Sequence, residues 1–384
     1  MHSWVANIYN QKKNFYLTSL WLLVQTLILV TSGINTSGEA ERVIREANNL
    51  QTLGHFSSSA FYMYFSEIAL VYFLHLKLGL SYAFIVFIQL LLNFTALIYF
   101  YKFMCWFYQS KKLALIGAIL LICCFPYQIY NSSLYTESIF FSLVIIFSCK
   151  LLTEKSFKIK NVLVLLFLMV LLMLTRPTAI FVLGATCVYI YFFFSKNLQI
   201  FWRIIIFLSL CTGSLLLLNF LVVESSSKVR GDFGIDILEP FRYEHIICGV
   251  PTLKNEFALK TVDKSNSLNG LLFYILHNFD QFSRLAFLKT KAFFGLQRSF
   301  YSTSHNIFLA LYFYPLYAFC LLTFFKFRQK TPKAFIYFIA LILFLWVCVI
   351  CSCDEWHSRF FLTLTPFWIL GALYFFKPTT SHFE

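Results

Sequence analysis

Repeated apolar stretches constrain this chain more than any other feature of its sequence. Runs of roughly 15–22 apolar residues recur from one end to the other, and a helix of that length crosses a hydrocarbon core of about 30 Å. Only 12% of the 384 residues are charged, whereas a soluble domain carries roughly 25%. The runs are continuous and not alternating, which excludes a transmembrane barrel. The sequence therefore predicts an all-α, polytopic membrane protein.

Lysine and arginine gather in the connectors between the apolar runs, so the net charge of +14 reflects membrane topology and not nucleic-acid binding. The basic connectors are Lys12–Lys13, Lys102–Lys112, Lys155–Lys160, Lys196–Arg203, Lys326–Lys333 and Lys377. If all of them are cytoplasmic, about ten spans alternate cleanly across the membrane. These spans are 16–33, 81–101, 113–130, 138–153, 161–175, 178–195, 203–223, 306–325, 335–352 and 360–376.

One further apolar stretch, residues 59–80, does not fit this alternation. Counting it as a full crossing would place every later basic connector outside. It also contains Glu67, His75 and Lys77. We therefore expect helices that lie at the outer interface of the membrane.

The chain is expected to have three parts: a transmembrane module over 1–223 with an outer loop at 34–80, a long outer loop over 224–305, and C-terminal helices over 306–384. Most cysteines lie in apolar runs and have the character of small buried side chains. In an oxidising compartment, Cys248 could pair with either Cys351 or Cys353.

Carboxylates follow two of the predicted spans on the outer side. Glu39 and Glu41 come after the first span, and Glu137 precedes the fourth. Each has a structural interpretation as an acid in the first turn of a helix. The functional alternative is a general base, because two carboxylates from separate segments can position an acceptor hydroxyl or bind a divalent ion.

Arginines and aromatic residues occur on the same predicted side. Arg176-Pro177 interrupts a long apolar run, so Arg176 is expected at the tip of a tight hairpin. Its guanidinium either snorkels to the interface or binds phosphate. A compact turn between two late spans supplies further charges, and an aromatic group lies just before the eighth span. These additional candidates are Asp354, His357, Arg359, Arg298, Tyr301 and His305.

With these motifs in this order, the chain resembles the GT-C superfamily of integral membrane glycosyltransferases, whose members include protein O-mannosyltransferases and the lipid A aminoarabinose transferase. The family's acidic motif after the first span resembles Gly38-Glu39-Ala40-Glu41-Arg42-Val43-Ile44, with Glu in place of Asp and Val43 in place of an aromatic residue. Its later motifs resemble Thr136-Glu137-Ser138, Thr175-Arg176-Pro177 and the turn from Asp354 to Arg359.

The resemblance implies an enzyme of the bacterial inner membrane whose active site faces the periplasm. It implies a polyprenyl-phosphate sugar donor and a glycan, lipid or protein acceptor. Glu39 would be the catalytic base with Glu41 in reserve, Glu137 would orient a substrate or hold a metal, and Arg176 and Arg359 would bind the donor phosphate. Two alternatives stay open: an O-antigen-type polymerase or ligase, and a transporter or flippase without enzymatic activity.

Overall fold

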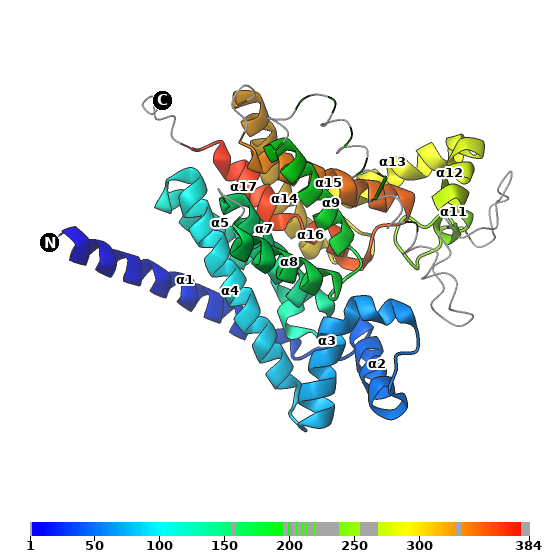
Figure 1. Cartoon of the computed structure of the whole chain (residues 1–384), viewed down its shortest axis with the longest axis horizontal. Helices are drawn as coiled ribbons and strands as arrows, with labels where there is room; N and C mark the ends of the chain where they lie inside the picture. The colour runs from blue at the N-terminus through cyan, green and yellow to red at the C-terminus, as the bar shows by residue number, and fades with distance from the viewer. Residues whose placement is uncertain are drawn as a thin grey trace.

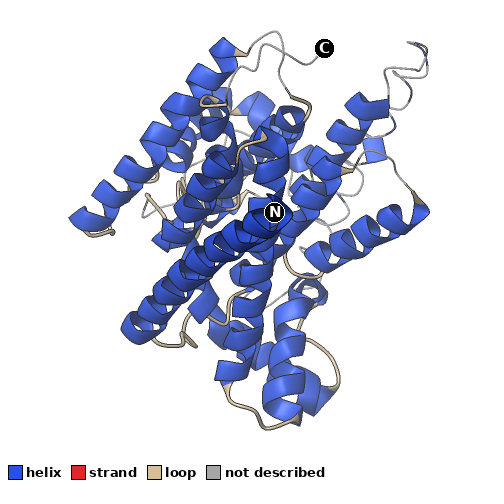
Figure 2. Ribbon diagram, turned by 90° about the vertical axis from the view of Figure 1, so that its left-hand side faces the viewer, coloured by secondary structure: helices blue, strands red, loops and turns tan. Residues whose placement is uncertain are grey.

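The computed structural model describes residues 2–154, 158–194, 238–253, 268–327 and 332–377, with scattered positions between 199 and 219. Helices account for nearly all regular structure in these residues (Figure 2). Strand-like pairing in the described parts is limited to isolated bridges, such as Asn35 with Ser133. The all-α class expected from the sequence is confirmed.

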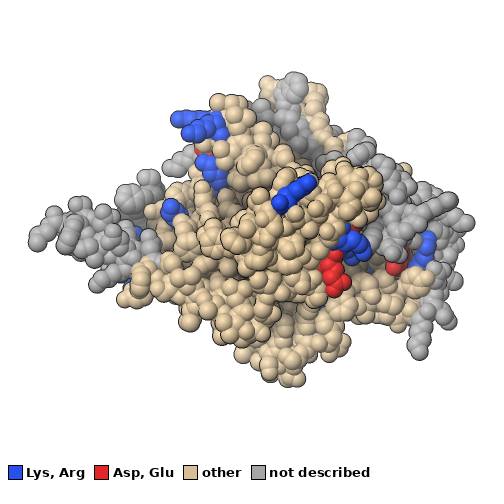
Figure 3. Space-filling model, turned by 90° about the horizontal axis from the view of Figure 1, so that it is seen from below, with Lys and Arg blue, Asp and Glu red and all other residues tan. Residues whose placement is uncertain are grey.

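Six helices of the described residues are long and apolar enough to cross a membrane, which makes this a multi-pass membrane protein. The six are Phe15–Ser32 within α1 (His2–Ser32), the helical segment Ser59–Lys77, α4 (Tyr82–Tyr108), α7 (Thr136–Thr153), α14 (Thr303–Lys326) and α15 (Ala334–Cys351). A bent pair of helices, α5 (Lys111–Cys123) and the helical segment Phe125–Ser132, meets at 65° and raises the number to seven if it counts as one broken span. On the face drawn in Figure 3, the charged side chains of the described residues form only a few small groups.

The count of ten spans stays a prediction. The helices α8 (Ile159–Met173) and α9 (Ala179–Phe194) occupy two expected spans but are short. The expected span 360–376 is divided into α16 (Arg359–Leu362) and α17 (Thr365–Tyr374). The expected span 203–223 lies largely outside the described residues.

The described parts of three basic connectors, at Phe107, Lys333 and Lys377, meet at one end of the helix bundle. Lys377 Nζ donates to the carbonyl of Phe107 over 3.5 Å, and Lys333 Nζ lies 4.4 Å from the ring centre of Phe193. The opposite helix ends carry the loops around residues 35, 133, 176 and 356, which contact one another as described below. The described helices therefore alternate in direction as the charge pattern predicts.

The apolar stretch that did not fit the alternation forms one helical run, made of η1 (Ser59–Tyr64), α3 (Phe65–Leu70) and η2 (Val71–Lys77). The Ser66 N–H donates to the carbonyl of Leu174 over 3.0 Å, at the end of the bundle opposite the basic connectors. After the turn at Gly79 the chain enters α4, and the Tyr82 ring stacks on His75 at 4.1 Å. Figure 1 shows α2, α3 and the start of α4 together at the bottom. These contacts favour the interfacial placement, which stays a prediction.

The helix α7 lies at the centre of the bundle, with 89% of its residues buried. It packs most extensively against α4, and Ser148 on α7 shares a hydrogen bond of 2.9 Å with Tyr337 on α15. Its first turn carries Glu137, whose side chain is fully buried. A charged residue at this position is therefore costly unless other groups pair with it.

The described part of the long loop over 224–305, which the sequence predicts to be outside, packs against the loop between α15 and α16. It contains α11 (Glu239–Arg242), α12 (Leu268–His277) and α13 (Phe279–Gly295). A disulfide joins Cys248 to Cys353, which decides between the two pairings that the sequence left open. Beside it, the Cys248 N–H donates to the carbonyl of Asp354 over 2.8 Å. The outer loop is thus fixed to the turn that carries Arg359.

The alternation of helix directions predicts which loops an external reagent reaches. Thr52 on α2 (Glu39–Leu53) and Lys112 at the start of α5 are both exposed, at opposite ends of the bundle. With a membrane-impermeant maleimide on intact cells, Thr52→Cys should be labelled above the background of the parent protein. Lys112→Cys should be labelled only after permeabilisation. The reverse pattern would contradict the topology.

Candidate active site

The four residues that the sequence placed at the centre of the site lie together. Arg176, in the hairpin between α8 and α9, donates through Nη1 to Glu137 Oε1. Arg359 Nη1 donates to Glu137 Oε1 over 2.7 Å and also to Glu39 Oε2. A fifth residue, Glu355, accepts from Arg359 Nη2 over 2.8 Å. We call these five residues the acid–arginine cluster.

Glu39 reaches the cluster because the loop before α2 pairs with the loop before α7. The Asn35 N–H donates to the carbonyl of Ser132 over 2.9 Å, and the Leu134 N–H donates to the carbonyl of Asn35 over 3.1 Å. Gly38 follows with φ of +66°, and a Cβ there would lie 3.0 Å from the Tyr135 hydroxyl. Only glycine suits this position, and it makes Glu39 the first residue of α2.

The geometry separates Glu39 from Glu41. Glu41 Oε1 accepts the Gly38 N–H over 3.3 Å, and the residue is exposed. It therefore acts as a cap for the first turn of α2. Glu39, the first residue of α2, instead accepts a hydrogen bond from Arg359.

Arg359 is aimed into the cluster by an unusual backbone turn. His357 and Ser358 both have left-handed conformations, with φ of 58° and 54°, which non-glycine residues rarely adopt. Arg359 then begins α16 and donates through Nε to the carbonyl of Trp356 over 3.2 Å. Two strained residues beside a buried guanidinium are typical of a functional turn.

Arg298 and Asp354 hold this turn and are not among the residues that line the large cavity described below. Arg298 Nη2 bonds Asp354 Oδ2 and lies 3.2 Å from Ser358 Oγ. The Asn306 side chain holds the backbone of Arg298. The Arg298 N–H donates to Asn306 Oδ1 over 3.0 Å, and Asn306 Nδ2 donates to the carbonyl of Arg298 over 2.9 Å. Both charged side chains are buried. The Arg298–Asp354 pair thereby holds the turn that carries Ser358 and Arg359.

A cavity of about 750 Å³ lies beside the cluster. Three of its residues form a stack in which the Tyr301 ring is nearly parallel to His305 at 4.2 Å and to His357 at 5.7 Å. Burial, then the charge of Arg359 and the proximity of His305, lowers the pKa of His357 and favours the neutral ring. The apolar part of the lining consists of Ile34, Phe125, Pro126, Ile129, Phe308, Leu309 and Leu362.

A second, smaller pocket of about 80 Å³ is lined by members of the cluster itself, Glu39, Arg176 and Glu355. Tyr135 lines both pockets. The cluster therefore contacts a small polar pocket and lies next to a large, mostly apolar cavity.

Two buried polar atoms of the cluster have no hydrogen-bond partner, Glu137 Oε2 and Arg176 Nε. Buried polar groups are almost always satisfied, so these atoms are suited to receive a bound group. The described residues contain no group of three or more histidine, cysteine or acidic side chains with metal-binding geometry. Glu137 Oε2 is an acceptor suited to a bound hydroxyl, and Arg176 Nε is a donor suited to an oxygen of a bound group.

Sequence reasoning missed Glu355 as a cluster member, although it lies four residues before Arg359 and both are polar residues of a short turn. It also missed Glu67, which is buried and accepts from Gln89 Nε2 over 2.9 Å. No sequence motif marks either residue. The contact of Glu355 with Arg359 depends on how the turn folds, and the contact of Glu67 with Gln89 depends on how α3 packs against α4.

Comparison with known protein families, with curated protein sequences and with solved structures finds no match for this chain. The likeness to the GT-C superfamily therefore stays a prediction from the motifs around Glu39, Glu137 and Arg176. Function is inferred below from the geometry of the acid–arginine cluster and its cavities.

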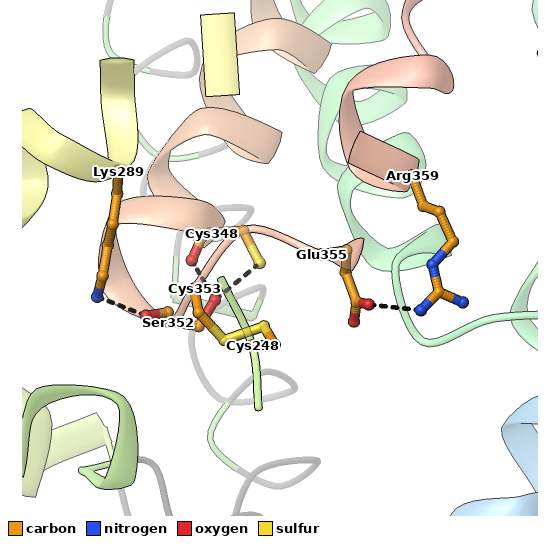
Figure 4. The surroundings of a disulfide bond; sticks show 7 residues. All are labelled: Cys248, Lys289, Cys348, Ser352, Cys353, Glu355 and Arg359. Atoms are coloured by element: carbon orange, nitrogen blue, oxygen red, sulfur yellow. Dashed lines mark hydrogen bonds and ion pairs between the residues drawn. A yellow bond between two sulfur atoms is a disulfide. The ribbon is translucent and has the colours of Figure 1, made fainter. Parts of the chain in front are cut away.

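A buried lysine supports the same turn from the outer loop. Lys289 on α13 donates through Nζ to the carbonyl of Ser352 over 2.5 Å, directly before the disulfide (Figure 4). Its side chain is fully buried, and its Nζ lies 4.2 Å from the ring centre of Phe241. Burial lowers the pKa of Lys289 to about 7, against a small opposing effect of Cys351. Folding therefore opposes the charged form of this lysine.

This burial predicts a pH-dependent stability. Between pH 7 and the ordinary lysine pKa of about 10.4, the unfolded chain binds a proton at Lys289 that the folded chain does not, so stability should rise with pH. The slope should approach about 1.4 kcal/mol per pH unit. Unfolding of wild type and Lys289→Met in detergent at pH 7 and 8.5 should show the rise in wild type only. If the free energy of unfolding changed with pH equally in wild type and Lys289→Met, the lowered pKa of Lys289 would be contradicted.

Proposed function

We propose that this protein is a membrane glycosyltransferase that moves a sugar from a polyprenyl-phosphate donor to a glycan, lipid or protein acceptor on the outer face of a bacterial inner membrane. The observation that carries the proposal is the acid–arginine cluster. Three carboxylates and two arginines from four separate segments meet beside a cavity at the end of the bundle opposite the basic connectors.

The chemistry of such a transfer needs one base and one phosphate-binding group. Glu39 accepts the proton of the acceptor hydroxyl, whose oxygen attacks the anomeric carbon of the sugar. The bond between that carbon and the phosphate oxygen breaks, and the polyprenyl phosphate leaves with the bonding electrons. Arg359 and Arg176 stabilise the charge that develops on the leaving phosphate. Attack from the opposite side gives inversion at the anomeric carbon.

The large cavity suits the donor. Its apolar lining from Phe125 to Pro126 and from Phe308 to Leu309 belongs to membrane helices, where an isoprenoid chain loses little by leaving the lipid. The stacked rings of Tyr301, His305 and His357 offer flat apolar faces of the kind that pack against a sugar ring. His357 precedes Arg359 by two residues, so the sugar and phosphate sites are adjacent in this assignment.

A transporter or flippase is the second candidate, and one observation favours it. The broken span at Cys124 is a feature of helices that line transport sites, and nearby Gln25, Gln128 and Asn131 form a buried polar network. The network also reaches α7, because Ser138 Oγ donates to Asn131 Oδ1 over 2.7 Å. It thereby fixes the turn that carries Glu137, which the transferase proposal requires. Flux of labelled polyprenyl phosphate across vesicles without turnover would support the transporter.

The transferase proposal predicts the phenotype of a gene deletion in the host. Mass spectrometry of surface glycans should show one sugar missing, and wild-type protein expressed from a plasmid should restore it. Glu39→Gln should fail to restore it, because loss of a general base slows transfer by about 10²–10⁴-fold. Glu41→Gln is the matched control on the same helix and should restore the sugar. Full restoration by Glu39→Gln would end the assignment of Glu39 as the base.

A further inference from the structure

The Arg359 guanidinium is almost fully occupied by protein acceptors. A guanidinium has five N–H donors. Arg359 uses Nε for the carbonyl of Trp356, Nη1 for Glu39 and Glu137, and Nη2 for Glu355. Bidentate binding of a phosphate needs two adjacent free donors. A phosphate can therefore bind Arg359 in this way only if one of the carboxylates leaves.

The three carboxylates that pair with Arg359 differ in how deeply they are buried and in how many partners bind them. Glu137 is fully buried and is also bonded by Arg176, so its release would leave a buried charge unpaired. Glu355 is on the same turn as Arg359 and its side chain is 23% exposed. Glu39 belongs to a separate helix, α2, and its side chain is 37% exposed. Glu39 is thus the carboxylate that an incoming anion displaces most easily.

Displacement of Glu39 changes what that carboxylate can do. In this structure its Oε2 atom accepts a hydrogen bond from Arg359. Glu39 also lines the small polar pocket, together with Arg176 and Glu355. A Glu39 carboxylate released from Arg359 stays beside this pocket, where an acceptor hydroxyl can enter and give up its proton.

We infer that the phosphate of the donor competes with Glu39 for Arg359, so that donor binding itself releases the catalytic base. This inference rests on the proposed function and adds the order in which its steps occur. The donor binds first, the freed Glu39 turns to the acceptor, and transfer follows. Before the donor arrives, Glu39 and Arg359 neutralise each other and the base is held inactive.

The competition predicts the direction in which the affinity for the donor phosphate changes when Glu39 is substituted. Removing the charge of Glu39 should strengthen donor-phosphate binding, although the same change abolishes transfer. The apparent affinity scales with the fraction of molecules in which Arg359 is free, and we expect Glu39→Gln to bind about tenfold tighter than wild type. Arg359→Lys should bind more weakly, because lysine cannot form the bidentate contact.

The experiment uses the full chain in nanodiscs and undecaprenyl phosphate as the probe, titrated by tryptophan fluorescence or calorimetry. Glu41→Gln is the matched control and should bind like wild type, since Glu41 caps α2 away from Arg359. Glu39→Ala provides a second test of the same charge and should also bind more tightly. Thermal unfolding of each variant verifies that it is folded.

The outcomes separate the inference from the proposed function. Tighter binding by Glu39→Gln and Glu39→Ala supports the competition. Binding equal to or weaker than wild type in both variants overturns it and leaves the transferase proposal standing. If wild type and all variants fail to bind the probe, the proposed donor is wrong and the proposed function falls with it.

Discussion

The pairing of Arg359 with Glu39 and Glu137 is the interaction on which the rest of the outer end depends. Five charged side chains from α2, α7, the hairpin between α8 and α9, and the turn before α16 meet there with little solvent. Burying the charges of Glu137, Arg176 and Arg359 is costly, and each is tolerated only because the others are present. Loss of Glu137 would leave the Arg176 charge uncompensated at a cost of about 3–5 kcal/mol. The cluster therefore joins segments that are up to 320 residues apart in sequence.

Every other feature of the site positions a member of the cluster. The disulfide, Lys289 and Arg298 all hold the turn that carries Glu355 and Arg359. Gly38 and Tyr135 set the start of α2 over the first turn of α7. The polar network of Gln25, Gln128 and Asn131 reaches the same turn from inside the bundle. A site so heavily supported is preorganised, as the transferase proposal requires.

The sequence predicted the membrane class, the alternation of helix directions and the meeting of Glu39, Glu137, Arg176 and Arg359. Each follows from a local signal: apolar length, the charge of connectors, or an ionisable residue at a helix end. It could not separate the Arg298–Asp354 pair, which holds the turn, from the acid–arginine cluster, because both consist of arginines bonded to carboxylates. Glu355 was not assigned to the cluster, because its contact with Arg359 depends on how the turn folds, and the contact of Glu67 with Gln89 depends on how two helices pack. The depth of Ser59–Lys77 in the bilayer also depends on contacts that hydropathy does not encode.

The central claim, that Arg359 and Glu137 stabilise each other inside the substrate-free protein, is tested most directly by a double-mutant cycle. Unfolding free energies would be measured in mixed micelles for wild type, Arg359→Gln, Glu137→Gln and the double variant. The structure predicts a coupling energy of about 1–3 kcal/mol, with the double variant less unstable than the sum of the single changes. A coupling energy indistinguishable from zero would mean that the two side chains do not meet, and the account of the site would be wrong.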